Sequence, residues 1–422
     1  MKSSYYNICL PFEDGHIIFN SITRRFFRVS DRNKDAFLEI LSSPDRYRDK
    51  YESFLKKMKA EGFIVDDDKN EMDDVKLLFD RQNNSNVYKL MILPTYQCNL
   101  RCWYCTQEHR NMRLAKEDVE SIKRHISYYL EHHPVRQLML SWFGGEPLLE
   151  FSIIEDISRH AMKCCEGLGL EFRNTITTNG TLLNRERLQK MKELNFTFFQ
   201  ITLDGAQEEH DQTKVLKGRS SYEVILKNIC LIAEMLPEAE ICLRYNYTLK
   251  NLQPERFVGD LNKYIPSELR KRIHLSLMKV WQEDERLFDH SLIESLMTLL
   301  ESNSYQINTY NGFNPCCVEK KHFNCIFPDG FVDKCSNDEL NLRRGFIGLS
   351  GEIKWNKELL FRNNTVFNNP TCSCYQCKFL PICYGPCPRE RDMWESLHCR
   401  YRNPEQHWRQ EILDFIRVHT NN

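Results

Sequence analysis

The chain has 422 residues, of which 41% are hydrophobic, enough for two or three domains with at least one sizeable core. Its formal net charge is −1, so no overall field favours nucleic acid or an anionic membrane as a partner. The N-terminus lacks a basic segment followed by an apolar one, and no run of about 18 apolar residues occurs. We therefore expect a cytoplasmic protein with neither a membrane nor a nucleic-acid partner. The 18 cysteines favour metal or cluster ligation over disulfides in that compartment.

The first 66 residues predict a small winged-helix-like module. Short apolar runs (YYNICLPF, HIIF and RFFRV) precede helical patterns around AFLEIL and YESFLKKMKAEG, and GFIV follows. The acidic and polar stretch from residue 66 to residue 86 predicts a linker with some helix in it. The module and its linker thus form a first domain over residues 1–85.

From Leu90 onward, apparent strands alternate with stretches of helical periodicity. The strands are expected at residues 89–94, 137–143, 171–178, 196–203, 241–249 and 272–280. This alternation implies a parallel α/β sheet, and about six units imply an open, partial (β/α)6 barrel like part of a TIM barrel, over residues 86–303. Functional residues are then expected on the loops that follow the carboxyl ends of the strands.

The segment CNLRCWYC, residues 98–105, follows the first of these strands. Cys98, Cys102 and Cys105 can bind three irons of a cubane cluster from a single loop and leave the fourth iron open to a small molecule. A structural zinc site is the alternative, but zinc prefers four ligands, and we expect no fourth Cys or His ligand close to the motif in the sequence.

Further polar motifs follow later strands in order. They are WFGGEPLL with Gly144, Gly145 and Glu146, TTNGT with Asn179, ITLDG with Thr202 and Asp204, and HDQTK with Lys214. Alone, each would be an ordinary turn or cap, whereas their order across some 120 residues indicates a common site.

These motifs resemble those of the radical S-adenosylmethionine (radical SAM) enzymes. The resemblance implies a [4Fe-4S] cluster whose open iron chelates the methionine group of SAM, and a 5'-deoxyadenosyl radical that abstracts a hydrogen atom. It places Tyr104 beside the adenine and Asn179 and Thr202 beside the ribose. It implies that Gly144 and Gly145 permit close backbone approach and that Glu146 accepts from the SAM amino group. Lys214 departs from the pattern, because an arginine commonly pairs with the SAM carboxylate there and a lysine lacks its bidentate fork.

The segment after residue 303 is rich in loops and cysteines up to an amphipathic helix around HWRQEILDFIRV. Its spacing resembles the SPASM domain, which holds two auxiliary [4Fe-4S] clusters. The resemblance assigns Cys317, Cys325, Cys335 and Cys387 to the first cluster and Cys374, Cys377, Cys383 and Cys399 to the second. Cys316 can replace Cys317, and a zinc ribbon is the alternative for this region viewed alone. The other cysteines (Cys9, Cys164, Cys165, Cys230, Cys242 and Cys372) lack ligand spacing and are expected to be core or surface thiols.

Radical SAM enzymes with a SPASM extension mostly modify peptides or proteins. The N-terminal module resembles the leader-recognition element of ribosomal-peptide maturases, in which a precursor's leader adds as a strand at a sheet edge. Arg24, Arg25 and Arg28 are candidate leader contacts there. We therefore expect a maturase that installs a thioether or carbon–carbon cross-link in a precursor peptide, with an electron donor such as flavodoxin or ferredoxin.

Two other reactions stay open. Peptide epimerisation is one. The other is formylglycine formation by a sulfatase-maturating enzyme, in which an aspartate directly after the equivalent of Cys335 acts as the base. Here Ser336 holds that position and the nearest carboxylate is Asp338. No other side chain stands out as a catalytic acid or base.

Overall fold

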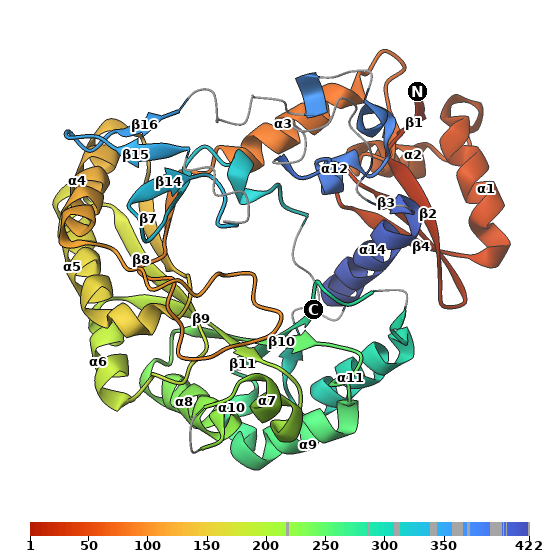
Figure 1. Cartoon of the computed structure of the whole chain (residues 1–422). Helices are drawn as coiled ribbons and strands as arrows, with labels where there is room; N and C mark the ends of the chain where they lie inside the picture. The colour runs from red at the N-terminus through yellow and green to blue at the C-terminus, as the bar shows by residue number, and fades with distance from the viewer. Residues whose placement is uncertain are drawn as a thin grey trace. The chain divides into compact units, whose positions relative to one another are not determined.

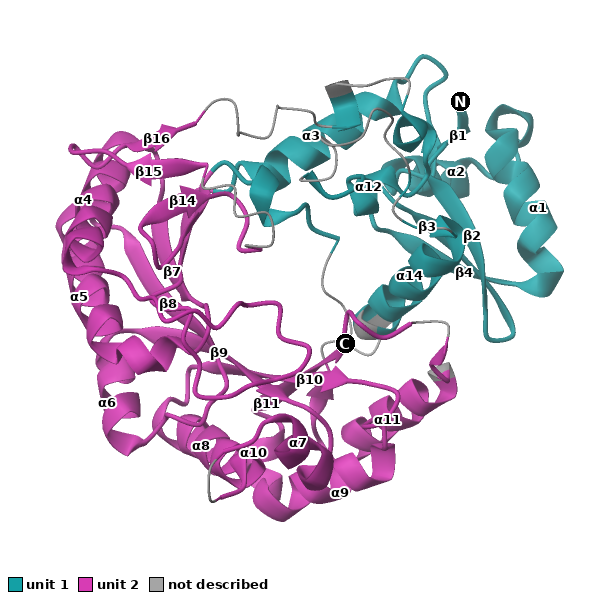
Figure 2. Ribbon diagram, viewed as in Figure 1, with its two compact units in different colours: residues 1–85, 310–321, 361–422 teal, residues 86–309, 322–360 magenta. Residues whose placement is uncertain are grey.

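The computed structural model describes residues 1–216, 219–284, 287–307, 313–337, 344–356, 366–368, 372–388, 399, 401 and 403–420. The chain forms two compact units (Figure 2). Unit 1 comprises residues 1–85, 310–321 and 361–422, and unit 2 comprises residues 86–309 and 322–360. In the described part of the chain, no helix is both long and apolar enough to cross a membrane.

Unit 2 contains the predicted run of parallel strands. Each strand pairs with the next in sequence, as in an open barrel (Figure 1). The strands are β6 (Val87–Ile92), β7 (Gln137–Trp142), β8 (Glu171–Thr178), β9 (Phe196–Leu203), β10 (Glu240–Tyr247) and β11 (Ile273–Lys279). Burial alternates along β6, where Tyr88, Leu90 and Ile92 are fully buried and the residues between them are only partly so. The predicted α/β partial barrel is therefore confirmed.

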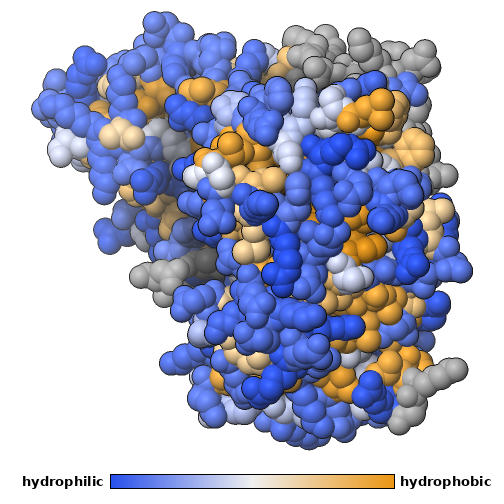
Figure 3. Space-filling view, turned by 90° about the vertical axis from the view of Figure 1, so that its left-hand side faces the viewer, coloured by the Kyte–Doolittle hydropathy of each residue, from blue (hydrophilic) through white to orange (hydrophobic). Residues whose placement is uncertain are grey.

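Helices cover the outer face of this sheet (Figure 1). They are α4 (Lys116–His132), α5 (Phe151–Leu168), α6 (Arg185–Glu193), α7 (Gln207–Thr213), α8 (Ser221–Met235), α9 (Pro254–Tyr264), α10 (Ser267–Arg270) and α11 (His290–Ser302). Their apolar faces and the outward-facing strand residues form one continuous core. The side that carries α4 and α5 is mainly hydrophilic, with separate apolar patches (Figure 3).

Short strands that the sequence analysis did not predict extend the sheet at both edges. They are β12 (Gln306–Ile307) beside β11, and β13 (Phe323–Ile326), β14 (Phe331–Asp333), β15 (Gly345–Ile347) and β16 (Ile353–Trp355) beyond β6. β13 pairs with β6 in parallel, and all four of its residues are buried. A buried run of four residues has no periodicity that distinguishes a strand, which explains the omission.

Unit 1 begins with three antiparallel strands followed by two helices and a short strand, in the predicted order. These elements are β2 (Asn7–Phe12), β3 (Gly15–Asn20), β4 (Phe26–Ser30), α1 (Asp31–Ser42), α2 (Glu52–Ala60) and β5 (Ile64–Val65). β3 lies between β2 and β4, whereas β5 pairs with β1 (Lys2–Ser3). A 3-10 turn, η1 (Pro44–Tyr47), joins the two helices.

Helix α3 (Glu71–Asn83) occupies much of the stretch predicted as a linker. The side chain of Asn70 caps it by accepting the Met72 N–H, and Val75 and Phe79 are buried. The carboxylate of Glu71 accepts hydrogen bonds from Ser4 and from the Tyr5 N–H. The segment is therefore packed within unit 1 and is more ordered than a linker.

Segments from the C-terminal part of the chain complete unit 1. They are η4 (Cys317–Glu319), η5 (Val366–Asn368), η6 (Ser373–Gln376), α12 (Leu380–Cys383) and α14 (Pro404–Thr420). Trp408, Ile412 and Phe415 of α14, the predicted final helix, share an apolar cluster with Ile17 and Phe19 of β3. The N-terminal sheet is thus stabilised by the C-terminal helix. The three-domain division stays a prediction.

Candidate active site

The cysteine loop begins just after β6, at the carboxyl edge of the barrel. A bridge between Thr95 and Arg113 closes its base, and the Tyr96 N–H donates to the Met112 carbonyl at 3.0 Å. The Thr95 hydroxyl donates to the same carbonyl at 2.8 Å. These bonds join the two ends of the loop, so Cys98, Cys102 and Cys105 are presented together.

The three thiols lie close enough to influence one another. Burial is the largest cause that raises the pKa of Cys102, to about 11. The charge of Lys214 lowers this pKa, and the thiols of Cys105 and Cys98 raise it further. Cys98 Sγ accepts the Leu100 N–H at 3.4 Å, and Cys105 is exposed. Three thiol donors on one loop fit a cluster that keeps one iron open.

His109 was overlooked in the sequence. Its Nε2 lies 3.5 Å from Cys105 Sγ, so the loop region does offer a fourth metal-binding side chain. Its position four residues after Cys105 was the available signal. Burial lowers the pKa of His109, followed by the charge of Arg101, so the neutral ring predominates near pH 7.

Tyr104 points into the barrel. Its hydroxyl lies 2.7 Å from both carboxylate oxygens of Asp204 and accepts from Asn246 Nδ2 at 3.1 Å. Its carbonyl accepts from Gln282 at 3.0 Å. Burial, then the charge of Asp204, raises the pKa of Tyr104, so the phenol stays protonated and donates. Tyr104 therefore ties the cysteine loop to the ends of β9 and β10, and its predicted adenine contact stays a prediction.

Asp204 and Lys214 form a buried ion pair beneath this tyrosine. Lys214 Nζ lies 3.3 Å from Asp204 Oδ1, and the two side chains are 2% and 1% exposed. Nζ also donates to the Thr202 carbonyl at 2.8 Å and to Thr202 Oγ1 at 2.5 Å. Since an ammonium group has three protons, these contacts engage all of them. A SAM carboxylate could contact Lys214 only by replacing one of these three partners.

A buried histidine supports the same pair. The Asp204 N–H donates to His210 Nδ1 at 3.1 Å. Burial, assisted by the charge of Lys214, lowers the pKa of His210, so this ring stays neutral and can accept. The sequence analysis did not single out His210, although it lies within the HDQTK motif.

The glycines of the GGEP motif allow β7 to approach the cysteine loop. A Cβ on Gly145 would lie 2.2 Å from the Gln97 carbonyl oxygen, and one on Gly144, with φ +113°, would lie 2.7 Å from that of Thr95. The predicted role of these glycines in close backbone approach therefore has a direct structural basis.

Glu146 is fully buried and joins the ends of β7 and β8. It accepts from Thr178 Oγ1 at 2.7 Å, from the Asn179 N–H at 2.8 Å and from the Leu148 N–H at 3.0 Å. Burial raises its pKa, and these donors oppose the shift. The carboxylate thus braces the site from within, and its predicted contact with the SAM amino group stays a prediction.

Asn179 contacts the cysteine loop directly. Its Nδ2 donates to Asn99 Oδ1 at 2.8 Å and lies 3.7 Å from Cys98 Sγ. Its Oδ1 accepts from the Thr181 N–H at 3.0 Å. The structure therefore gathers the motifs after β6, β7, β8 and β9 at one edge, as the order of the motifs in the sequence predicted.

An inner cavity of about 970 Å³ lies along the concave face of the barrel. Its wall mixes apolar, hydroxyl-bearing, amide and charged side chains, with the charged groups on β6, on β8 and at the start of β10. Its lining includes Met91, Met139, Ser141, Phe143, Thr175, Phe198, Lys89, Arg173, Glu240 and Ser336. Ser336 thus reaches this cavity, where a sulfatase-maturating enzyme is expected to have an aspartate. Asp338 lies outside the described residues.

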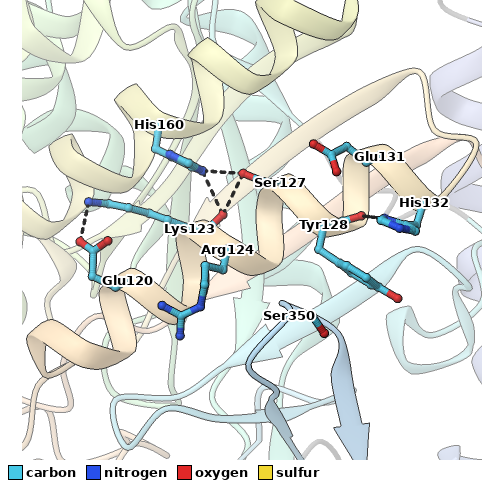
Figure 4. A pocket seen from close by; sticks show the side chains of 9 residues that line it. All are labelled: Glu120, Lys123, Arg124, Ser127, Tyr128, Glu131, His132, His160 and Ser350. Atoms are coloured by element: carbon cyan, nitrogen blue, oxygen red, sulfur yellow. Dashed lines mark hydrogen bonds and ion pairs between the residues drawn. The ribbon is translucent and has the colours of Figure 1, made fainter.

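A second pocket, of about 550 Å³, lies on the outer helices α4 and α5 (Figure 4). Its polar groups are largely paired with one another: Lys123 with Glu120 at 3.0 Å, and Ser127 Oγ with His160 Nε2 at 3.0 Å. It lies on the outer face of the helices, away from the cysteine loop, and we do not regard it as the active site.

The cysteines predicted to bind the first auxiliary cluster are divided between the two units. Cys325 is buried on β13 and Cys335 follows β14, both in unit 2, whereas Cys317 and Cys387 belong to unit 1. In Cys316 the pKa is raised by its contact with the Cys317 thiol and then by burial. The two thiols are adjacent, so either can serve as the ligand.

The second predicted set lies entirely in unit 1. Burial is the largest cause that raises the pKa of Cys374. The neighbouring thiols of Cys372, Cys383 and Cys377 raise it further. Burial also raises the pKa of Cys377, and the Cys399 thiol adds to that increase. Four neighbouring thiols fit a fully ligated cluster. Cys372 is buried, as expected of a core thiol, but it also caps η6 by accepting the Cys374 N–H at 3.4 Å.

A partial barrel with a three-cysteine loop at its carboxyl edge defines the radical SAM class. The model of the Radical SAM superfamily matches residues 92–254, so this part of the chain is a radical SAM domain and the predicted resemblance is confirmed. A [4Fe-4S] cluster and SAM are the cofactors of this class.

Known proteins extend the comparison. The serine-type anaerobic sulfatase-maturating enzyme of Bacteroides thetaiotaomicron is 30% identical over 32% of this chain and 34% of its own length. The alignment thus spans about a third of that relative. Native anSMEcpe with bound AdoMet and the Cp18Cys peptide is 20% identical, with a TM-score of 0.56 over 80% of this chain and 99% of the other.

Streptococcus suis SuiB bound to the precursor peptide SuiA is 16% identical, with a TM-score of 0.51 over 96% of this chain and 99% of that one. At these identities the two structures show a shared fold.

Proposed function

We propose that the protein is a radical SAM peptide maturase that abstracts hydrogen from a ribosomally made precursor peptide and installs a thioether or carbon–carbon cross-link. The proposal assigns the SAM-binding cluster to Cys98, Cys102 and Cys105. It assigns the two auxiliary [4Fe-4S] clusters to the cysteine sets predicted from the sequence, and SAM contacts to Tyr104, Gly144, Gly145, Glu146, Asn179, Thr202 and Lys214. A bound cluster with SAM would supply the 5'-deoxyadenosyl radical.

The observation that carries the proposal is the open edge of the N-terminal sheet. Within the described residues, β4 pairs with β3 on one side and no strand pairs with its other side. A sheet edge without a strand partner is the kind of site at which a peptide strand adds, and β2 forms the other such edge of this sheet. SuiB, the neighbour whose structure covers 96% of this chain, is described as bound to its precursor peptide.

The arginines named as leader contacts are already partly engaged. Arg24 donates to the Phe313 carbonyl at 2.6 Å, and Arg25 pairs with Glu61 at 3.2 Å. Arg28 pairs with Glu13 at 2.6 Å and is 53% exposed. Leader recognition is therefore assigned mainly to the β4 backbone, with Arg25 and Arg28 as exposed flanking cations.

The residues of the barrel position the reaction. Tyr104, Asp204 and Lys214 hold the cysteine loop, while Glu146 fixes the strand ends that carry the glycines. The inner cavity, lined by side chains along the middle and amino ends of the strands, has room for a peptide side chain.

Formylglycine formation is the second candidate. The sequence similarity to the Bacteroides enzyme and the fold similarity to anSMEcpe favour it. The lining of the cavity by Ser336 disfavours it, because a neutral hydroxyl is a weak proton acceptor.

Mass spectrometry after anaerobic incubation with SAM and a strong reductant tests the choice. The substrates are a short peptide encoded beside this gene and, in parallel, a sulfatase peptide. Loss of two hydrogens per site, with fragments that do not separate across a ring, is the expected result for the precursor. Formylglycine in the sulfatase peptide with an unchanged precursor would overturn the maturase proposal.

A further inference from the structure

An arginine that none of the predicted motifs contains lies on the concave face of the barrel. On β10, Ile241, Leu243 and Tyr245 face the helices and belong to the buried core. Because side chains alternate along a strand, Arg244 and Asn246 face the inside of the barrel. Arg244 is partly buried, and its Nε donates to Asn246 Oδ1 at 3.0 Å.

Asn246 connects this arginine to the residues that hold the cysteine loop. Its Nδ2 donates to the Tyr104 hydroxyl at 3.1 Å and to Asp204 Oδ1 at 3.3 Å. Burial lowers the pKa of Arg244, and the proximity of Tyr104 and Asp204 raises it. The guanidinium group therefore belongs to the same part of the barrel as the predicted SAM contacts, and it stays charged near pH 7.

The charge of Arg244 has no carboxylate partner among the described residues. Asp204, which shares Asn246 with it, already forms an ion pair with Lys214 at 3.3 Å. Apart from its bond to Asn246, Arg244 makes no hydrogen bond or ion pair within the described part of the chain. Neither of its terminal nitrogens is a fully buried atom without a partner, so both are open to a ligand. A partly buried cation of this kind favours the binding of an anion.

Two hydroxyl groups flank Arg244 at the same level of the sheet. The strand register places it beside Thr202 of β9 and Ser276 of β11, whose side chains also alternate onto the concave face. Neighbouring strands lie about 4.8 Å apart, so one ligand can contact all three side chains. The Thr202 hydroxyl accepts from Lys214 and can still donate, and Ser276 makes no side-chain hydrogen bond to a described residue. A guanidinium fork between two hydroxyl donors fits the two oxygens of a carboxylate.

We propose that Arg244, with Thr202 and Ser276, binds a carboxylate of the substrate peptide, either in an acidic side chain or at the C-terminus. The inference rests on the proposed maturase function and adds a chemical feature of its substrate. Arg244 is then a specificity-determining residue. Two parallel hydrogen bonds from its guanidinium group to the carboxylate fix the orientation of the peptide inside the barrel.

The position of Arg244 favours the peptide over SAM as the source of the carboxylate. The methionine carboxylate of SAM is expected at the open iron, on the loop after β6. Arg244 lies within β10, level with Thr202, the expected ribose contact. The radical is expected on the 5'-carbon of that ribose, and the inner cavity reaches Gln200, two residues before Thr202. A peptide carboxylate at Arg244 is therefore held between the cavity and the carbon that abstracts hydrogen.

Arg244→Gln and Arg244→Lys test the proposal in the full-length, cluster-loaded enzyme. The probes are the peptide encoded beside this gene, the same peptide with each Asp or Glu changed in turn to Asn or Gln, and its form with an amidated C-terminus. Arg159→Gln is the matched control, since Arg159 lies on the outer helix α5 and is 54% exposed. The readouts are peptide affinity by fluorescence anisotropy, cross-linking kcat/KM by mass spectrometry, and SAM affinity by equilibrium dialysis.

We expect wild type and Arg159→Gln to bind and modify the unchanged peptide about tenfold better than one of its amide forms. The amide form that is disfavoured identifies the carboxylate as a side chain or as the C-terminus. Arg244→Gln should lose this preference, whereas Arg244→Lys should keep part of it, because lysine retains the charge without the bidentate fork. SAM affinity should match wild type in both variants.

A preference that persists in Arg244→Gln would overturn the inference, and so would a wild type that treats every amide form like the unchanged peptide. The second comparison decides the outcome even if Arg244→Gln does not fold. Loss of SAM affinity with the peptide preference intact would also overturn the inference and assign the guanidinium group to the SAM carboxylate. A wild type that binds the unchanged peptide selectively yet forms no cross-link would instead reject the proposed reaction and support the carboxylate site.

Discussion

The carboxyl edge of the barrel and the cysteine-rich part of unit 1 both gather thiols, but by different means. At the barrel edge, Cys98, Cys102 and Cys105 sit on a loop held by side-chain bonds from four neighbouring strand ends. In unit 1, Cys374, Cys377 and Cys383 lie on or directly beside η6 and α12, elements of four residues each. Such short turns stabilise themselves poorly. We infer that the barrel edge is preorganised by the fold, whereas the unit 1 set depends on its ligand.

Replacing Cys98, Cys102 and Cys105 together with alanine should give the largest effect. SAM cleavage should fall below detection because no ligand remains for the cluster that binds SAM, whereas the fold of the barrel should persist. Deoxyadenosine quantification and circular dichroism measure the two outcomes. The matched control is a triple alanine variant of Cys164, Cys165 and Cys230, which should keep SAM cleavage; deoxyadenosine from the first variant would disprove the site assignment.

Iron removal should separate the two regions. Without clusters, the amides of residues 372–388 should lose hydrogen-exchange protection by about a thousandfold or more, since ligand binding contributes directly to folding there. The amides of β6–β9 should change little. Equal loss in both regions, or protection of residues 372–388 that survives iron removal, would contradict the comparison.

Asp204→Ala should destabilise the barrel edge by about 3 kcal/mol, because it leaves the charge of Lys214 buried without a partner. Chemical denaturation of the anaerobic protein measures the loss. The double variant Asp204→Leu with Lys214→Met removes both charges and should recover part of the stability. A single variant as stable as wild type would show that the ion pair does not hold the edge.

The sequence could predict what depends on local pattern. The six parallel strands, the cysteine loop and the order of the later motifs follow from periodicity and from turn residues. The internal hydrogen bonds of Glu146 and Lys214 could not be predicted from local pattern. Glu146 accepts from Thr178 and Lys214 donates to Thr202, and these pairs form only when distant strand ends meet in the fold. β13 was missed for a related reason: its four residues are defined by pairing with β6, more than 200 positions away.

The smallest predicted effect concerns a buried network that connects the barrel to β13. Asn324 Nδ2 donates to the Tyr88 hydroxyl at 2.9 Å, that hydroxyl donates to His125 Nε2 at 2.6 Å, and His125 Nδ1 donates to the Gly351 carbonyl at 2.8 Å. Each ring nitrogen of His125 thus has a hydrogen-bond partner that suits the neutral ring. Burial lowers the pKa of His125 from 6.5 to about 4. β13 carries Cys325, so this network anchors to the barrel one cysteine that is predicted to bind an auxiliary cluster.

Because the folded-state pKa of His125 lies below the unfolded one, its contribution to stability is complete above about pH 6.5 and is lost as the pH falls toward 4. Between pH 7.5 and 5.5 the free energy of unfolding should drop by about 1 kcal/mol through this group. His125→Gln, which keeps one donor and one acceptor but does not titrate, should reduce the pH dependence by that amount. If the variant and wild type lose the same stability over this range, His125 is not the titrating anchor, and the attachment of β13 depends on the cluster as the unit 1 cysteines do.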